Sequence, residues 1–276
     1  MRTERGGARR LSALLALATL LGTGLALAQS SGPAAGKTAG EEEKPKAGGD
    51  WQHWRANNDV TDLPSAQRGA RNFVSYCLGC HSLKYERWSR LGGDLGIPHD
   101  VLEKELLPPG DKPLQYIQTS MPPADAEAWF GKVPPDLSLM VRARGRDYIY
   151  QFLKTFYVDL TRQTGANNLR LPTTAMPHVL SELEGPKRAV FTEVSKAGAG
   201  GSTREMVFDH FEPLAPGRLS AAEYDAFVRD TVNFLDYVSE PTQSVRRALG
   251  VWVVLFLLVF TWLAWLVKRE YWKDVH

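Results

Sequence analysis

Apolar residues gather in two long runs near the ends of this chain, at residues 11–25 and 248–267. The second run has about 20 residues without a charge, and at about 1.5 Å per residue a helix of that length crosses the roughly 30 Å hydrocarbon core of a bilayer. It predicts one transmembrane helix over 248–267, followed by a cytoplasmic tail over 268–276. The first run is shorter and follows a stretch rich in arginine.

The N-terminal run has the pattern of a secretory signal peptide. It ends at Ala26-Leu27-Ala28, small residues that are typical of a cleavage site. We predict a signal peptide over 1–28, and an uncleaved N-terminal anchor is the alternative. Residues 29–50 have too few apolar side chains to offset chain entropy, which predicts a flexible leader. An exported N-terminus and one stop-transfer helix place the body, 51–247, outside the cytoplasm.

Within the body, apolar residues recur with helical spacing. One face of a helix that begins after Pro64 carries Ala70, Phe73, Val74 and Cys77. Ser65 is its predicted N-cap. Gly69 in this helix either permits the close approach of another helix or is an ordinary tolerated glycine. A second helix over Ser220–Ser239 begins with a capping box formed by Ser220 and Glu223, and Pro241 ends it.

Shorter patterns predict the remaining elements. A middle helix is expected over Asp147–Tyr157 and a short one over Asp100–Leu107. Two β-prone segments, Val190–Val194 and Met206–Phe211, are separated by glycines and predict a small β-hairpin. About 220 exported residues are enough for one domain with a good core. We therefore expect one mainly α domain with large loop insertions and a C-terminal transmembrane helix.

Charge adds little to this picture. The formal net charge is +2 at pH 7, with 33 basic and 31 acidic residues. Nothing in this balance suggests a nucleic-acid partner, so none is predicted.

The two cysteines of the chain both lie in Cys77-Leu78-Gly79-Cys80-His81. This spacing is typical of c-type haem attachment, in which two thiols add to the vinyl groups of one porphyrin and the adjacent imidazole binds the iron. A zinc site would need two further Cys or His ligands at comparable spacing, and no second such pair exists. A redox dithiol is a distant alternative. The motif therefore predicts one covalent haem c held by Cys77, Cys80 and His81.

An electron-transfer haem needs a second axial ligand. The candidates in the exported body are Met121, Met140, Met176, Met206, His53, His99, His178 and His210. Met176 is favoured because it lies in a loop beside Pro177, which restrains the backbone, and because thioether ligation raises the potential. Met121, also followed by proline, and His178, which would make a bis-histidine haem, stay open on the residues alone.

Several short motifs follow one another along the chain. They are Arg68-Gly69, Tyr76-Cys77-Leu78-Gly79-Cys80-His81-Ser82-Leu83, Pro134-Pro135-Asp136-Leu137-Ser138, Arg142-Ala143-Arg144, Asp147-Tyr148, Asn167-Asn168-Leu169, Ala175-Met176-Pro177-His178, Asn233-Phe234-Leu235 and Glu240-Pro241. Each motif is weak, but their order and spacing together are highly specific. In that order they resemble the cytochrome c1 family, the haem subunit of ubiquinol:cytochrome c oxidoreductase, and the likeness covers about Trp51 to the C-terminus.

The resemblance implies roles for individual residues. It implies a class I cytochrome c-like haem domain with His81 and Met176 as axial ligands. It also implies that Arg144 and Tyr148 lie against the haem propionates, since a buried carboxylate requires a cation or donor. Pro135 would line the haem pocket by the same likeness.

The resemblance also implies an electron relay inside a larger complex. An electron would pass from the Rieske iron-sulfur protein to this haem and then to a soluble or membrane-bound c-type cytochrome. The chain would pack against cytochrome b within a dimeric complex of the bacterial inner membrane, with the haem domain periplasmic. No residue is expected to act as acid, base or nucleophile, so the chain is a non-catalytic redox subunit.

Two departures and two rivals qualify the likeness. Some bacterial relatives hold the ligand loop with an extra disulfide, for which this chain has no cysteines. Family members often attract a basic cytochrome with acidic patches, and here the acidic residues are interleaved with basic ones. A stand-alone membrane-tethered cytochrome is one rival, and a haem peroxidase or dehydrogenase with a vacant iron position is the other.

Overall fold

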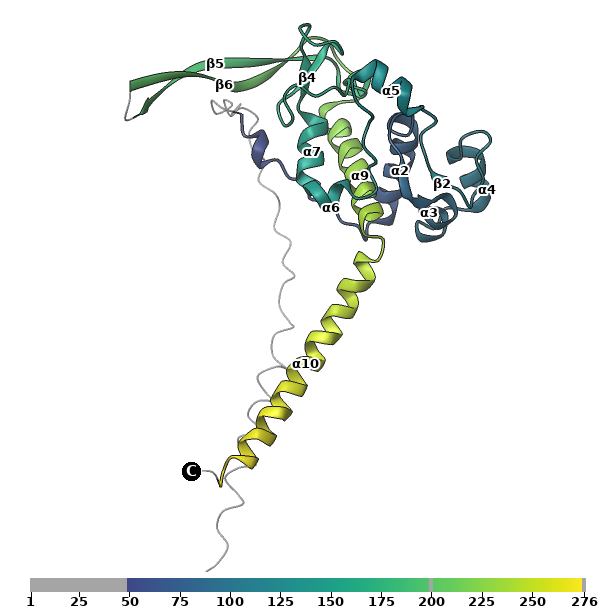
Figure 1. Ribbon diagram of the computed structural model, residues 1–276, viewed down its shortest axis with the longest axis vertical. Helices are drawn as coiled ribbons and strands as arrows, with labels where there is room; N and C mark the ends of the chain where they lie inside the picture. The colour runs from purple at the N-terminus through teal and green to yellow at the C-terminus, as the bar shows by residue number, and fades with distance from the viewer. Residues whose placement is uncertain (1–48, 199–200, 275–276) are drawn as a thin grey trace, which may run out of the picture. The chain divides into compact units, whose positions relative to one another are not determined.

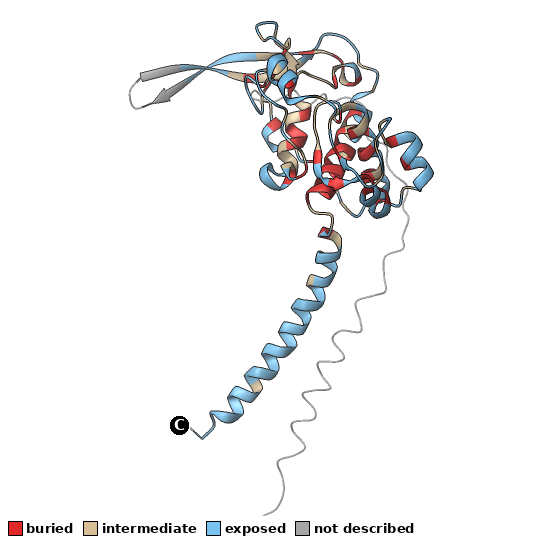
Figure 2. Ribbon diagram, turned by 45° about the vertical axis from the view of Figure 1, so that its right-hand side comes forward, coloured by how far each residue is buried: buried red, intermediate tan, exposed pale blue. Residues whose placement is uncertain are grey.

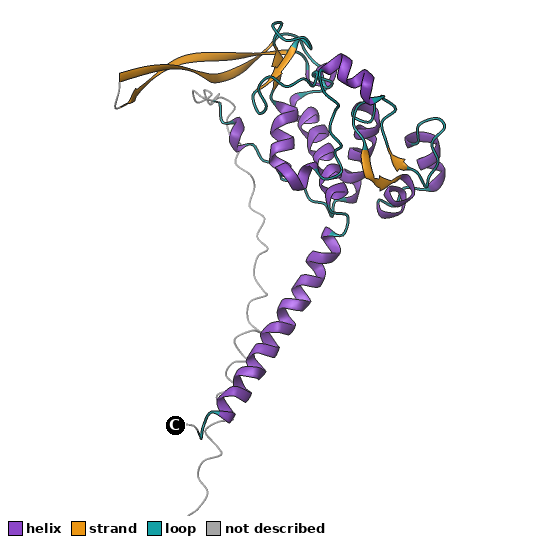
Figure 3. Ribbon diagram, in the orientation of Figure 1, coloured by secondary structure: helices purple, strands orange, loops and turns teal. Residues whose placement is uncertain are grey.

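The computed structural model describes residues 49–198 and 201–274. The predicted signal peptide, 1–28, and all but the last two residues of the predicted leader lie outside the described residues. Helices dominate the described part of the chain, and its strands form three antiparallel pairs (Figures 1 and 3). This agrees with the expectation of a mainly α protein with a C-terminal apolar helix.

The element bounds are as follows. The described α-helices are α2 Leu63–Tyr76, α3 Trp88–Asp94, α4 His99–Val101, α5 Pro123–Phe130, α6 Met140–Arg144, α7 Arg146–Lys154, α8 Ser181–Glu184, α9 Ala221–Ser239 and α10 Gln243–Tyr271. A 3₁₀ turn, η1, covers Trp51–His53, and a π-helical turn, η2, covers Leu102–Leu106. The strand pairs are β1 Leu83–Arg87 with β2 Tyr116–Ile117, β3 Phe156–Val158 with β4 Ala166–Asn168, and β5 Lys187–Gly198 with β6 Gly201–Pro213.

Helix α2 begins earlier than predicted. Its N-cap is Asp62, whose side chain accepts a hydrogen bond from the Ser65 backbone N–H at 3.0 Å, and Pro64 lies in the first turn. Ser65 is therefore inside the helix, and its hydroxyl instead donates to Asp230 of α9 at 2.7 Å. The prediction of Ser65 as the cap was wrong because Asp62, three residues before it, offers a carboxylate in the better position.

Helices α2 and α9 pack closely at Gly69, and this contact is the centre of the body. A Cβ atom on Gly69 would lie 2.0 Å from the Asp230 carbonyl oxygen and 2.6 Å from the Phe234 Cβ. Of the two sequence interpretations of Gly69, close approach of another helix is therefore confirmed. The Phe73 ring packs against that of Phe234, with 5.7 Å between the ring centroids and 48° between the ring planes, and both residues are fully buried. Buried residues gather where these helices meet (Figure 2).

Helix α9 follows its predicted pattern closely. Ser220 is the N-cap, and its side chain and that of Glu223 form the predicted capping box. Tyr224, Val228 and Leu235 of the predicted stripe are buried. The second half of α9 is buried on nearly every side, which is why polar residues such as Asp230 and Asn233 occur there with partners on other elements.

The middle helix ends earlier than the pattern predicted. Helix α7 stops at Lys154, and Phe156–Val158 instead form β3 against β4. The Asn168 side-chain amide donates to the Phe152 carbonyl at 2.8 Å, which adds to the longer hydrogen bond, at 3.4 Å, that this carbonyl accepts from the N–H of the C-cap Thr155. The missed boundary therefore depends on a partner 16 residues away along the chain.

The strands β5 and β6 are longer than the segments predicted for them. Their antiparallel pairing runs from Lys187 opposite Pro213 to Gly198 opposite Gly201, with an irregularity between Val190 and Phe191. The predicted short helix over 100–107 occurs as α4 followed by the π-helical turn η2.

Helix α10 contains the predicted transmembrane segment and extends it at both ends, from Gln243 to Tyr271. It is long and apolar enough to cross a membrane, and no other helix among the described residues is. Its side chains are exposed along most of its length (Figure 2), and Gln243 is its buried residue. An apolar helix without a covering protein surface is compatible with membrane anchoring.

Candidate functional site

The two cysteines lie on a turn that directly follows α2. Cys77 is the C-cap of the helix, and its carbonyl accepts hydrogen bonds from the backbone N–H groups of Cys80, at 3.0 Å, and His81, at 2.8 Å. Neither thiol forms a disulfide. Burial raises the pKa of Cys77 to about 12 and raises that of Cys80 as well. Thiols with raised pKa values are poor redox nucleophiles, which argues against the dithiol alternative.

The His81 ring is oriented by a residue far along the chain. Its Nδ1 lies 2.8 Å from the carbonyl oxygen of Pro135. A carbonyl oxygen only accepts, so Nδ1 carries the proton and the lone pair of Nε2 is left for another partner. Burial lowers the pKa of His81, which favours the neutral imidazole that metals bind. Pro135 therefore contacts His81 with its backbone carbonyl, while the residue as a whole is exposed.

Backbone contacts hold the segment 134–138 beside the residues that follow His81. The Leu137 N–H donates to the Ser82 carbonyl at 2.9 Å, and the Lys84 N–H donates to the Asp136 carboxylate at 2.8 Å. On the other side of the motif, the Thr119 hydroxyl donates to the Gly79 carbonyl at 2.8 Å. Thr119 was not singled out from the sequence, because no local pattern links it to a residue 40 positions away.

Arg144 and Tyr148 lie together at the junction of α6 and α7. Gly145, with φ of 90°, separates the two helices, and the Arg144 guanidinium lies 5.6 Å from the centre of the Tyr148 ring. The guanidinium of Arg170 lies 4.7 Å from the same ring. Within the described residues, neither arginine has a carboxylate partner. Two unpaired cations beside a phenol suit a ligand with carboxylate groups, as haem has. Arg170 was missed, although it directly follows the Asn167-Asn168-Leu169 motif.

An asparagine network shapes the loop that carries Met176. The Asn168 side-chain oxygen accepts hydrogen bonds from the backbone N–H groups of Arg170, at 2.8 Å, and Leu171, at 3.1 Å. The Asn167 side-chain oxygen accepts from the Thr173 N–H at 2.9 Å. Thr173 has φ of 63°, which is unfavourable for a β-branched residue and needs such support. Met176 is half-buried after this loop.

The structure separates Met176 from most of its rivals. His178 is occupied, because its Nε2 lies 3.1 Å from Glu184 and its ring stacks on Phe156 at 4.9 Å. Met206 is 62% exposed, and the side chains of His53 and His99 are more than two-thirds exposed. The remaining candidates are placed otherwise: Met140 packs against the core, His210 pairs with Asp209, and Met121 is half-buried. Met176 as the iron ligand stays a prediction, with Met121 as its alternative.

Comparisons with known proteins agree on one family. The sequence model of the Cytochrome C1 family matches residues 203–275. Cytochrome c1 of Allochromatium vinosum is 46% identical over 221 residues, which are 80% of this chain and 88% of that protein. The ammonia monooxygenase gamma subunit of Nitrosomonas europaea is 40% identical over 222 residues, again 80% of this chain and 88% of that protein. A solved structure described as a hyperthermophilic respiratory Complex III matches with 18% identity and a TM-score of 0.37, covering 81% of this chain and 87% of that one.

Proposed function

Since this chain belongs to the cytochrome c1 family, we propose that it carries one covalent haem c and passes single electrons within a cytochrome bc1 complex. Family membership implies the haem, and the Cys77-to-His81 motif is the attachment site that the sequence offers. The observation that carries the proposal is the orientation of His81: its Nδ1 contacts the Pro135 carbonyl, and its Nε2 has no hydrogen-bond partner among the described residues. An imidazole prepared in this way is suited to bind iron.

The protein's own residues would hold the haem and set its environment. Cys77 and Cys80 would form the thioether links, His81 would bind the iron on one side, and Met176 on the other. Bound haem supplies reversible one-electron chemistry, and a thioether ligand raises its potential. Arg144, Arg170 and Tyr148 would compensate the propionate charges, because both arginines lie free of carboxylate partners in the described part of the chain.

We infer the surroundings of the chain from the family. The haem domain would be a class I cytochrome c-like fold on the periplasmic side of a bacterial inner membrane. Helix α10 would anchor it beside cytochrome b in a dimeric complex, with the C-terminus cytoplasmic. The Rieske protein would donate the electron, and a soluble or membrane-bound c-type cytochrome would accept it.

A visible spectrum of the purified full chain, oxidised and reduced, tests the haem and its ligands. A charge-transfer band from sulfur to ferric iron near the red edge is expected, and Met176→Leu should abolish it. The matched variant Met121→Leu should leave it intact. Loss of the band in Met121→Leu instead would move the ligand to Met121. Reduced wild-type protein that binds carbon monoxide readily would contradict a methionine-ligated relay and favour the peroxidase or dehydrogenase.

Copurification tests the partners. After mild detergent extraction, a subunit of the proposed complex leaves the membrane together with cytochrome b. A chain that purifies alone, with its haem intact, would instead be a stand-alone membrane-tethered cytochrome.

A further inference from the structure

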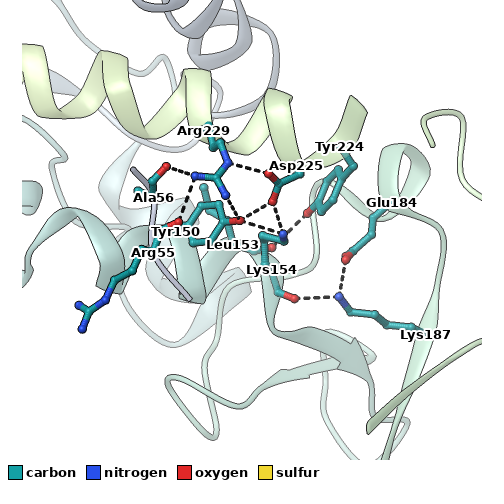
Figure 4. Close-up of polar contacts among 10 residues, drawn as sticks. All are labelled: Arg55, Ala56, Tyr150, Leu153, Lys154, Glu184, Lys187, Tyr224, Asp225 and Arg229. Carbon is teal, nitrogen blue, oxygen red and sulfur yellow. Dashed lines mark hydrogen bonds and ion pairs between the residues drawn. The ribbon is translucent and has the colours of Figure 1, made fainter. Parts of the chain in front are cut away.

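A buried ionic cluster lies directly after the Met176 loop and has no part in the function proposed so far. Glu184, the last residue of α8, pairs through one oxygen with the Lys187 ammonium and through the other with His178 Nε2. The three side chains are 8 to 14% exposed. The Lys187 ammonium also donates to the Lys154 carbonyl at 2.8 Å (Figure 4). Buried charges of this kind are destabilising unless their partners are held in place.

The cluster is tied to the core from several elements. The His178 ring stacks on Phe156 of β3, with 7° between the ring planes. The Lys187 ammonium lies 4.3 Å from the ring centre of Phe211 in β6. Burial lowers the pKa of Lys187, while the charge of Glu184 opposes this shift. The cluster therefore joins the end of the Met176 loop to α7, β3 and the β5–β6 pair.

The chain between His178 and Met176 transmits this constraint. Pro177 alone separates the two residues, and its ring restricts the backbone at that point. On the other side of Met176, its backbone N–H donates to the Thr174 hydroxyl at 3.3 Å, within the loop shaped by Asn167 and Asn168. The loop is thus held from both sides. A disulfide cannot do this, since both cysteines lie in the attachment motif.

We propose that His178, Glu184 and Lys187 are positioning residues that keep the Met176 sulfur within reach of the iron. This inference rests on the proposed ligation by Met176. The cluster restricts the loop in place of a covalent link, so the iron–sulfur bond forms without first ordering the loop. When the cluster is broken, the loop moves more freely and the sulfur leaves the iron more often.

The test compares Glu184→Gln and His178→Phe with the control Glu182→Gln in the full chain, haem attached, in detergent. Phenylalanine keeps a ring against Phe156 while removing the contact with Glu184, so His178→Phe is the milder variant. Glu182 lies on the same helix, but its pair with Arg218 is exposed, at 69% and 66%. Three quantities are measured: the temperature at which the iron–sulfur band disappears, carbon monoxide binding to the reduced protein, and helix unfolding by circular dichroism.

In both cluster variants the band should disappear further below the unfolding temperature of that variant's own helices than it does in the wild type, because the unpaired buried charge lowers the stability of the whole fold as well. Carbon monoxide binding should increase at least about tenfold, the factor expected for losing one hydrogen bond to a charged group. The Glu182→Gln control should match the wild type in all three quantities.

Two results would overturn the inference while leaving the proposed function intact. In the first, both cluster variants lose the iron–sulfur band at the wild-type temperature and bind carbon monoxide as the wild type does. In the second, the band and the helices are lost over the same temperature range in each cluster variant, which would show that the cluster stabilises the fold and does not position Met176. If Met176 is not the iron ligand, the iron–sulfur band will persist in Met176→Leu, and this result is independent of the cluster variants.

Discussion

Glu86 is the acidic side chain that the fold buries with least compensation. It is 2% exposed, and its Oε1 has no hydrogen-bond partner among the described residues. Burial raises the pKa of Glu86 to about 7, and the nearby Arg90 opposes this shift while Asp94 adds to it. The Tyr237 hydroxyl donates to Asp94 at 2.9 Å, so the phenol lies in the same group. Sequence patterns did not single out Glu86, because its neighbours Tyr85 and Arg87 are exposed.

The free energy of unfolding should depend on pH through Glu86. Its folded pKa of about 7 lies above the ordinary 4.5, so between these values the folded protein binds more protons than the unfolded one. Stability therefore falls as pH rises from about 4.5 to 7 and is constant above. Glu86→Gln cannot ionise, so it should match the wild type near pH 4.5 and exceed it by roughly 3 kcal/mol at pH 8.

Urea denaturation at both pH values measures this difference. Glu127→Gln, on the exposed surface of α5, is the control and should leave stability unchanged at either pH. A Glu86→Gln variant whose advantage is equal at both pH values would show that packing, and not ionisation, is responsible.

At the scale of elements, the packing of α2 on α9 decides where the attachment motif stands. Arg68 forms two hydrogen bonds with the Asp230 carboxylate, at 2.6 and 2.9 Å, and Asn72 donates to the Thr231 hydroxyl at 3.2 Å. These contacts fix the rotation of α2 about its axis and so the direction in which Cys77 leaves it. The helical spacing of α2 was readable locally, but its partner lies about 160 residues away along the chain.

Gly69→Ala should separate the two helices. Alanine usually stabilises a helix interior relative to glycine, but here the added Cβ would lie 2.0 Å from the Asp230 carbonyl oxygen. We expect the free energy of unfolding to fall by about 1–3 kcal/mol, as overpacking does in cores. Gly93→Ala in α3, where a Cβ meets nothing within 4 Å, is the matched control. Equal stability of the two variants in urea would refute the close approach.

Loss of the α2 cap should have a smaller effect. Asp62→Ala removes the acceptor of the Ser65 N–H, and we expect a cost of about 1 kcal/mol, seen as a lower melting temperature. Asp62→Ser retains an acceptor and should recover most of the loss. If serine and alanine lowered the melting temperature equally, the carboxylate would act through another contact.

At the scale of the whole chain, the body and α10 bury different surfaces. The core of the body comes from α2, α3, α7 and α9 together with the shorter helices, strands and loops between them, whereas the described part of α10 contributes one buried residue, Gln243. The apolar side chains of α10 therefore need another apolar environment. A lipid bilayer provides one without requiring any change in the body.

Ending the chain at Glu240 should release it from membranes. The truncated chain should appear in the soluble fraction with the haem spectrum of the full chain, because the body's core does not use α10. Alkaline carbonate washing followed by centrifugation measures the partition, and the full chain should stay in the pellet. A truncated chain that also pellets would show a second attachment to the membrane.

Features that depend on spacing over a few residues were predictable from the chain as written. The attachment motif, the capping box of α9 and the apolar run of α10 are of this kind, because helix periodicity, capping and bilayer thickness act locally. Contacts between distant segments were not predictable. Packing brings together groups that no local pattern relates. Examples are the hydrogen bond between His81 and the Pro135 carbonyl, the contact of the Arg170 guanidinium with the Tyr148 ring, and the pairing of His178 with Glu184. The end of α7 at Lys154 is of the same kind, since the Phe152 carbonyl accepts a hydrogen bond from the distant Asn168 side chain, whereas the Asp62 cap of α2 is a local contact that the sequence pattern missed.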